Sequence, residues 1–246
     1  MMTKFNMKMV AAVLLVMLVG VAAFADDGKL KVLLITGGHP FDTNDFYKVF
    51  DANSQIAVTH DANNRTNAPA YEREDLLSFD VVVLYDMPLS ITEAQKAKFL
   101  SLFDKGVGLV VLHHALVSYQ HWPEYGRIVG GKYPEADGQS GVVTPEKGYQ
   151  HDVEVPVEIV AKKHPITAGL KDFTIHDEIY WGFRVGPDVT TLITTSQPKS
   201  GKPLGWCRKE KKSRVVYLQL GHDHQAYENP GYRELVARSV RWAAGR

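Results

Sequence analysis

Four unbroken apolar runs constrain the fold of this chain more than any other feature of its sequence. They occupy residues 29–36 (KLKVLLIT), 79–85 (FDVVVLY), 108–112 (GLVVL) and 213–220 (SRVVYLQL). A strand with one face in solvent alternates apolar and polar residues, whereas an unbroken apolar strand is buried on both faces, as in parallel sheets. Since helical segments separate the runs, we predict an α/β fold with a mostly parallel sheet and helices on both faces.

The segments between these runs predict the helices and the remaining strands. The clearest helix begins at Thr92, which forms a capping box with Gln95, and ends at Gly106. Further helices are expected at 42–52 and 232–244, a partial helix at 71–77, strands at 55–60, 151–161, 189–195 and 204–208, and a loop rich in Gly, Pro and charge at 132–150. The strand 151–161 alternates and contains Pro156, which favours an edge position.

The N-terminus has the features of a secretory signal peptide. Lys4 and Lys8 precede an apolar run from Met9 to Ala25, and Ala23-Phe24-Ala25 forms a cleavage site. We therefore expect cleavage after Ala25, a single domain over residues 29–246, and a periplasmic or secreted protein with no membrane partner. The alternative is an uncleaved anchor, since the run has about the minimum length for crossing a bilayer.

The composition excludes two classes of structure and function. The 28 basic and 28 acidic residues balance, so the chain lacks the basic footprint of a nucleic-acid-binding protein. Cys207 is the single cysteine, which excludes an internal disulfide, and we expect it to be a small structural residue of a strand. The sequence leaves open whether the chain forms a homo-oligomer.

Polar, titratable residues follow four of the predicted strands. They are His39, Asp86, the pair His113-His114, and the triplet His222-Asp223-His224. Because the carboxyl ends of parallel strands meet at one edge of a sheet, where open α/β folds bind ligands, we expect these side chains to share a crevice. Any one of the histidines can instead be a half-buried structural imidazole, but their recurrence at successive strand ends favours a functional site.

A second polar group lies at residues 176–180 (HDEIY), in a segment predicted to be a loop. It places two carboxylates, Asp177 and Glu178, beside the aromatic ring of Tyr180. The alternative is a turn in which Asp177 caps a helix or pairs with an arginine.

Six short motifs together resemble the ThuA-like (trehalose utilisation) family. In order they are GLVVLHHA (108–115), HPITAGLKDF (164–173), DEIY (177–180), PLGW (203–206), RVVYLQLGHD (214–223) and SVRWA (239–243), and the resemblance covers residues 31–243. That family is related in fold to the class I glutamine amidotransferases. The resemblance therefore implies a flavodoxin-like sheet, in agreement with the strand pattern.

The comparison with amidotransferases also excludes their reaction. Those enzymes carry a nucleophilic cysteine on a sharp turn after a central strand, and a histidine after a later strand. His222 occupies a place similar to that histidine, but the turn falls at His113 or His114, and Cys207 is far away in the sequence. Since glutamine hydrolysis by this route needs a thiolate, we do not expect a glutaminase.

Histidines and carboxylates together can bind a metal or transfer protons. The candidate catalytic residues are His113, His114, Asp177, Glu178 and His222, and the candidate ligands of a divalent ion such as zinc are His113, His222 and one of Asp177, Glu178 or His151. Without a metal, the same residues would act as general acid and base, because histidine titrates near neutral pH. We expect no nucleotide cofactor.

The resemblance implies a function in sugar catabolism, on trehalose-like glycosides or their 3-keto derivatives. A ketone at C3 acidifies the C2 proton, so a base at C2 would allow the glycosidic oxygen on C1 to leave by elimination; hydrolysis is the other route. Candidate substrate-binding residues are His39, Asp86, Trp122, Tyr180, Asp223 and His224. The competing hypothesis is a catalytically silent carbohydrate-binding protein. A serine hydrolase is disfavoured because the chain has no G-x-S-x-G motif.

Overall fold

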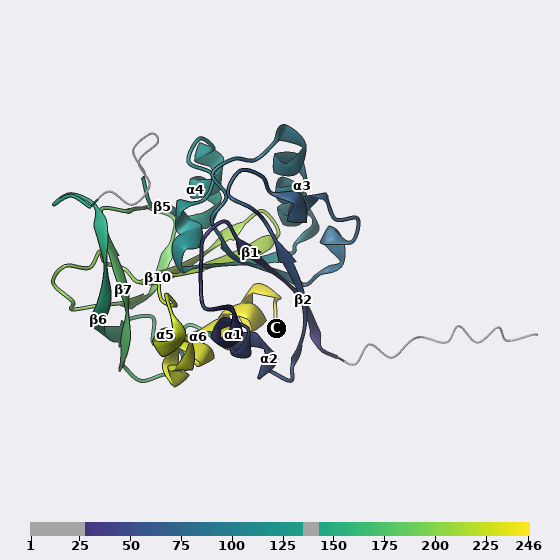
Figure 1. Cartoon of the computed structure of the whole chain (residues 1–246). Coiled ribbons are helices and arrows are strands. Elements are labelled where there is room, and N and C mark those ends of the chain that lie inside the picture. Colours follow the sequence, from purple (N-terminus) through teal and green to yellow (C-terminus); the bar gives the residue numbers. More distant parts are fainter. Residues whose placement is uncertain (1–27, 135–142) are drawn as a thin grey trace, which may run out of the picture.

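The computed structural model describes residues 28–134 and 143–246, which form a nine-stranded sheet covered by helices on both faces (Figure 1). Five adjacent strands run parallel in the order β2-β1-β3-β4-β11. They are β1 (Leu30–Gly37), β2 (Ile56–Ala62), β3 (Val81–Asp86), β4 (Gly108–Leu112) and β11 (Ser213–Leu218). This order is that of flavodoxin-like sheets, so the predicted fold class is confirmed. The predicted signal peptide, residues 1–25, lies outside the described residues.

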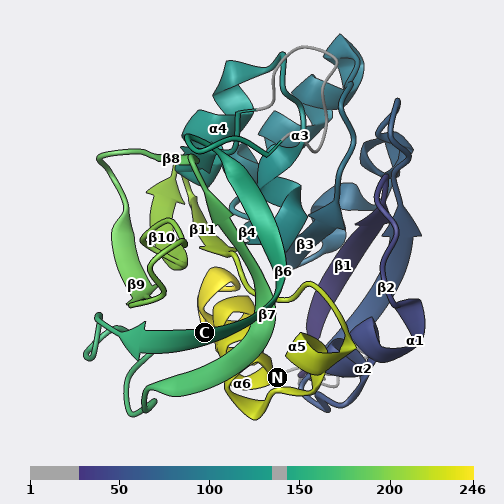
Figure 2. The same ribbon diagram turned by 60° about the vertical axis from the view of Figure 1, so that its left-hand side comes forward.

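An antiparallel extension continues the sheet beyond β11. Its strands follow in the order β10-β9-β6-β7, and they are β6 (Gly148–Ile159), β7 (Phe173–Trp181), β9 (Thr190–Thr194) and β10 (Gly205–Glu210). Figure 2 shows β6 and β7 side by side at the outer end of this extension. A separate two-stranded sheet joins β5 (Gly131–Lys132) to β8 (Arg184–Val185).

The extension corrects three predictions. The segment 176–180 is part of strand β7 and not a loop; its adjacent charged residues hide the strand pattern because their side chains are buried. Strand β6 begins at Gly148, inside the segment 132–150, and it is an inner strand with β7 at the edge. Pro156 is tolerated there because β9 pairs only with Glu158 and Ile159, which leaves the proline outside that ladder.

Two hydrophobic clusters cover the two faces of the sheet. On β1, Val32 and Leu34 belong to one cluster, and Leu33 and Ile35 belong to the other, so the strand is buried on both sides as predicted. The first cluster packs against α1 (Thr43–Phe46), α2 (Lys48–Asp51), α5 (His224–Glu228) and α6 (Pro230–Ala243), and the second against α3 (Glu93–Lys105) and α4 (Pro123–Val129). These layers hold the strand ends in fixed positions.

The structure confirms the predicted helix that begins at Thr92 as a single helix and divides two others into shorter segments. The capping box of α3 is confirmed, because Thr92 Oγ1 accepts a hydrogen bond from Gln95 N–H at 3.2 Å and Gln95 Oε1 accepts one from Thr92 N–H at 3.1 Å. The helix predicted at 42–52 consists of the two short helices α1 and α2. The partial helix predicted at 71–77 corresponds to two 3₁₀ turns, Pro69–Glu72 and Leu76–Ser78, and a third 3₁₀ turn follows β4 at His113–Val117.

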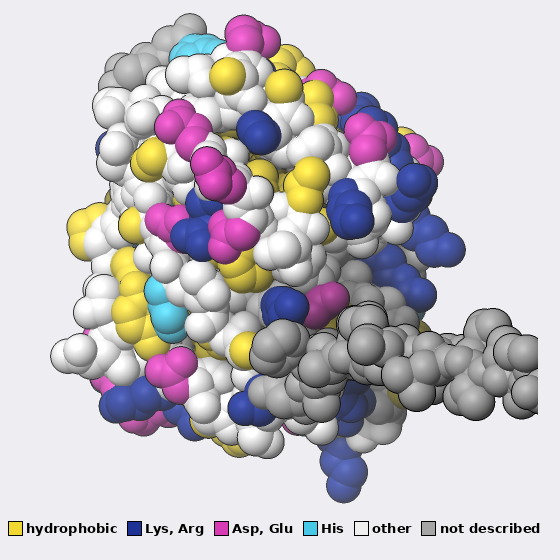
Figure 3. Space-filling model, turned by 90° about the vertical axis from the view of Figure 1, so that its right-hand side faces the viewer, with side chains coloured by type: hydrophobic (Ala, Val, Ile, Leu, Met, Phe, Trp, Pro, Cys, Tyr) yellow, Lys and Arg dark blue, Asp and Glu magenta, His cyan; other side chains and the backbone are white. Residues whose placement is uncertain are grey.

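The surface carries charges of both signs. On the face in Figure 3, acidic and basic side chains are interspersed, with Lys and Arg more prominent along the right-hand side. Within residues 28–134 and 143–246, no helix combines the length and the apolar character needed to cross a bilayer.

A β-bulge in β6 decides which face His151 occupies. Between Gln150 and Val153 the register with β7 shifts, and Asp152 has the left-handed φ of 56°. Because the bulge adds one residue to the alternation, Val153 packs in the core with its neighbouring valines, while His151 Nδ1 lies 3.3 Å from Glu178 Oε1 on β7. The bulge therefore directs His151 toward the carboxylate.

Replacing Asp152 with valine should destabilise the bulge. A β-branched residue is strained at positive φ, by about 1–2 kcal/mol, whereas asparagine adopts this conformation readily. We expect Asp152→Val to lower the free energy of unfolding by that amount, measured by urea denaturation, and Asp152→Asn to be nearly neutral. Equal losses in both variants would show that the Asp152 charge matters and the backbone conformation does not.

Candidate active site

His113 lies at the turn that follows the central strand β4. Its backbone has the left-handed φ of 49°, which is uncommon for a residue other than glycine, and its side chain is completely buried. The Nδ1 atom is 2.6 Å from the carbonyl oxygen of Gln219. Since a carbonyl only accepts, Nδ1 carries the hydrogen in this contact. In the neutral imidazole, Nε2 then presents a lone pair, and in the protonated imidazole it is a donor.

Three side chains from distant segments surround His113 Nε2. Glu178 Oε2 on β7 is 3.0 Å away, His222 Nδ1 after β11 is 3.2 Å away, and the Tyr180 hydroxyl is 2.9 Å away. The distance between Glu178 Oε2 and His222 Nδ1 is 3.4 Å. One ligand atom from each of His113, Glu178 and His222 lies within 4.8 Å of the others. We refer to these three residues as the His-Glu-His cluster.

Glu178 is ionised within the cluster. Its burial alone would raise the pKa, but hydrogen bonds with His113 and His222 outweigh burial and hold the pKa of Glu178 well below its usual range. For His222, burial lowers the pKa, but the hydrogen bond and charge of Glu178 outweigh it, so the pKa of His222 is raised. A buried carboxylate beside two imidazoles attracts positive charge, either a proton or a metal ion.

Asp177 accepts hydrogen bonds from backbone N–H groups, two of which belong to members of the cluster. Its Oδ2 accepts a hydrogen bond from Gly221 N–H at 2.8 Å, and its Oδ1 accepts from His222 N–H at 2.9 Å and Glu178 N–H at 2.8 Å. Burial raises the pKa of Asp177, although His113 and the backbone donors oppose the rise. With both oxygens occupied, Asp177 fixes the backbone positions of Glu178 and His222.

Two tyrosines missed by the sequence analysis hold the loop after β11. The Tyr85 hydroxyl donates to the carbonyl oxygen of Gly221 at 2.7 Å, and the Tyr227 hydroxyl donates to that of His222 at 2.8 Å. In the sequence, Tyr85 belongs to an apolar run and Tyr227 lies between the last predicted strand and the last predicted helix, so nothing in the local pattern distinguishes either. Their role depends on contacts between segments far apart in the chain.

His39 and His114 form a second group beside the cluster. Their rings stack with centroids 4.6 Å apart, and the ring of His114 also lies 5.5 Å from that of His113. Burial lowers the pKa of both His39 and His114, which favours neutral imidazoles. The predicted gathering of histidines from different strand ends is therefore present in the structure.

Four other predicted site residues have recorded contacts or positions outside the His-Glu-His cluster. Asp86 Oδ2 accepts from Asn63 Nδ2 at 2.7 Å, and burial raises the pKa of Asp86 to about 7. Trp122 packs its ring against Phe99 in the cluster beneath α3 and α4. Asp223 caps α5 by accepting from Gln225 N–H, and His224 is the exposed first residue of that helix. Their substrate-binding roles remain predictions.

Cys207 has its recorded contact with His164, which is not a member of the His-Glu-His cluster. It lies in β10, its Sγ is 3.5 Å from His164 Nε2, and burial raises the pKa of its thiol to about 11. A thiol with this pKa is protonated and weakly nucleophilic at neutral pH. This environment agrees with a structural cysteine.

Solved structures with similar folds come from several organisms. A ThuA-like protein from Parabacteroides merdae ATCC 43184 is 22% identical, with a TM-score of 0.74 over 88% of this chain and 90% of that one. A ThuA-like protein from Bacteroides uniformis ATCC 8492 is 20% identical, with a TM-score of 0.62 over 91% and 94%. The β-galactosidase of Rahnella sp. R3 is 16% identical, with a TM-score of 0.56 over 87% of this chain but 31% of that one. At these identities, the similarities show the fold alone.

The family itself is shown by the sequence comparison. A comparison with curated proteins finds no match to the chain. The ThuA family model, described as trehalose utilisation, matches residues 31–243, which include all three residues of the His-Glu-His cluster. The chain therefore belongs to the ThuA family, and this membership supports a function related to trehalose utilisation.

Proposed function

We propose that the protein is an enzyme that processes a trehalose-like glycoside or 3-keto-glycoside at the His-Glu-His cluster. The observation that carries this proposal is the convergence of His113 Nε2, Glu178 Oε2 and His222 Nδ1 at 3.0–3.4 Å from one another. Three segments distant in sequence are brought together there, one of them in a left-handed backbone conformation. Strain and buried charge of this kind concentrate at functional sites.

The cluster fits a divalent ion such as zinc. Tetrahedral ligands about 2.0–2.1 Å from zinc are about 3.3 Å from each other, close to the three separations in the cluster. His113 also has the hydrogen bond from its other ring nitrogen to a backbone carbonyl that orients metal-binding histidines. When bound, the ion would supply a Lewis acid for a substrate oxygen. His151, beside Glu178, is the further candidate ligand.

Exposure indicates which side chains meet the substrate. The side chains of His113 and Glu178 are 1% and 5% exposed, whereas those of His222 and His151 are 23% and 46% exposed. The cluster is therefore open on the side of His222 and His151. We assign contact with the sugar to the imidazoles of His222 and His151. We assign the binding of positive charge, of a proton or a metal ion, to His113 and Glu178.

These roles suit elimination from a 3-keto-glycoside. An imidazole accepts the C2 proton, the electron pair of the C–H bond forms the C1–C2 double bond, and the C1–O bond breaks as the leaving oxygen takes a proton from an acid. In the cluster without an ion, the second imidazole is placed to supply that proton; with an ion bound, His222 is a ligand and His151 is the imidazole left to transfer protons. Hydrolysis uses the same acid and base, with water as nucleophile, so analysis of the products distinguishes the two routes. We further propose a periplasmic or secreted location, supported by the sequence of residues 1–25.

Metal content provides the first test. We expect protein purified without a histidine tag to hold about one divalent ion per chain by elemental analysis, and His113→Asn and Glu178→Gln to lose it. His176→Asn is the matched control, because His176 is a partly buried histidine that also contacts carboxylates. Retention of the ion by both cluster variants, or its loss from the control, would contradict a metal site at the cluster.

Turnover of trehalose and 3-keto-trehalose provides the second test. We expect His222→Gln to reduce kcat by about 10²–10⁴-fold, the range for loss of a positioned acid or base, with an unchanged circular dichroism spectrum. Glu178→Gln removes the negative charge beside that imidazole and should also reduce kcat. His176→Asn should retain wild-type turnover. If the wild type binds both sugars without converting either, the proposal of an enzyme fails and a carbohydrate-binding protein takes its place.

A further inference from the structure

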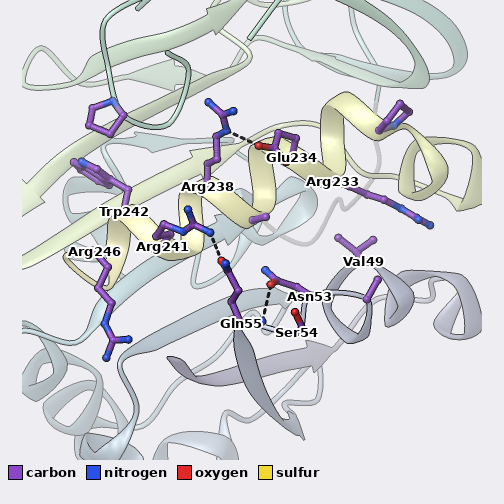
Figure 4. Close-up of a pocket in the computed structure, with 14 residues that line it drawn as sticks. Val49, Asn53, Ser54, Gln55, Arg233, Glu234, Arg238, Arg241, Trp242 and Arg246 are labelled. Atoms are coloured by element: carbon purple, nitrogen blue, oxygen red, sulfur yellow. Dashed lines mark hydrogen bonds and ion pairs between the residues drawn. The ribbon is translucent and has the colours of Figure 1, made fainter. Parts of the chain in front are cut away.

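A large cavity, lined in part by α6 and by residues 52–55, is shown in Figure 4. Its volume is about 670 Å³, and it separates α6 from the turn that leads into β2. Gln55, which lines it, directly precedes the first residue of β2, so the cavity lies at the amino ends of the parallel strands. His113 follows the carboxyl end of β4. The cavity is therefore a separate feature.

Four arginines line this cavity. Arg233 and Arg246 lie toward its two ends, with Arg238 and Arg241 between them (Figure 4). Glu234 pairs with Arg238 at 2.6 Å. Among the described residues, no carboxylate lies within ion-pair distance of the guanidinium groups of the other three arginines. The cavity therefore carries an excess of positive charge that the described part of the chain does not neutralise.

Neutral oxygen atoms hold these three guanidinium groups in place. Arg233 Nε donates to the carbonyl oxygen of Tyr227 at 2.6 Å, and Arg246 Nη1 donates to that of Gly28 at 2.9 Å. Arg241 donates to Gln55 Oε1. A guanidinium has five N–H donors, so each group is oriented by one bond and keeps others for an acceptor. Such fixed forks match carboxylate and phosphate oxygens.

The dipole of α6 favours Arg241 and disfavours Arg233, although Arg233 also donates to the Tyr227 carbonyl at the end of α5. Arg241 lies in the last turn of α6, where a positive charge is favourable, whereas Arg233 lies in the first turn, where the helix dipole opposes it. The Tyr227 carbonyl occupies one donor of Arg233, and no carboxylate among the described residues pairs with it, so its remaining donors are open to an anionic ligand. Arg233 is therefore the residue that points most directly to binding.

We propose that this cavity binds a small organic ligand carrying at least two oxyanion groups, either carboxylates or phosphates. Its volume is within the range of about 300–1,000 Å³ that is typical of small-molecule sites. The arginines are spread along the cavity, so one anionic group would contact only part of them (Figure 4). The concave shape favours a small molecule over a flat membrane surface. This inference does not depend on the reaction proposed for the cluster.

Calorimetric titration tests the proposal, with citrate and glucose 1,6-bisphosphate as probes and glucose as the neutral comparison. We expect Kd below about 1 mM at low salt for one or both anions, weakening with added salt, and no binding of glucose. Arg233→Gln and Arg241→Gln should each weaken binding at least about tenfold. Lys98→Gln/Lys209→Gln, a double change at exposed positions outside the cavity, should bind like the wild type.

Three results would overturn the proposal. The first is the absence of binding to both anions in the wild type, whose fold is intact by circular dichroism. The second is equal affinity in the arginine variants and the lysine control, which would show adventitious attraction to net charge. The third is binding only to vesicles of anionic phospholipid or to oligo-glutamate, which would assign the cavity to a membrane or an acidic peptide. Preference for citrate or for the bisphosphate identifies the oxyanion.

Discussion

The buried carboxylate of Asp177 is the interaction on which the arrangement of the site depends. It joins β7, in the antiparallel extension, to the loop that follows β11 in the parallel half of the sheet. A buried carboxylate is costly unless hydrogen-bond donors surround it, and three backbone N–H groups meet that requirement here. Because one of these donors belongs to Glu178 and another to His222, the same carboxylate sets the positions of two members of the His-Glu-His cluster.

The turn after β4 supplies the third member. His113 has a left-handed backbone and is anchored by the Gln219 carbonyl, so its Nε2 points at Glu178 and His222. In the glutamine amidotransferases that this fold resembles, the corresponding turn carries a nucleophilic cysteine. An imidazole at that turn offers a lone pair or a proton in place of a thiolate. The chemistry proposed at this turn therefore relies on the imidazole of His113.

The antiparallel extension distinguishes this site from one built on the parallel strands alone. The parallel half contributes His113 and His222, but Glu178 and Tyr180 come from β7, and His151 comes from the bulge in β6. Without β7, the two histidines would lack the buried carboxylate that lies 3.0 Å from His113 Nε2 and 3.4 Å from His222 Nδ1. The extension therefore completes the cluster and also forms the side on which His151 is exposed.

The sequence by itself determined the parallel half of the fold and the strand ends that carry its histidines. Burial on both faces is a local property, visible as unbroken apolar runs, and the carboxyl ends of such strands must share an edge. Only the tertiary structure decided that 176–180 is a strand, that β6 is internal, that Asp177 binds backbone donors, and that Tyr85 and Tyr227 hold the loop. These features depend on hydrogen-bond partners from distant segments, and a partner's identity leaves no local pattern in the chain.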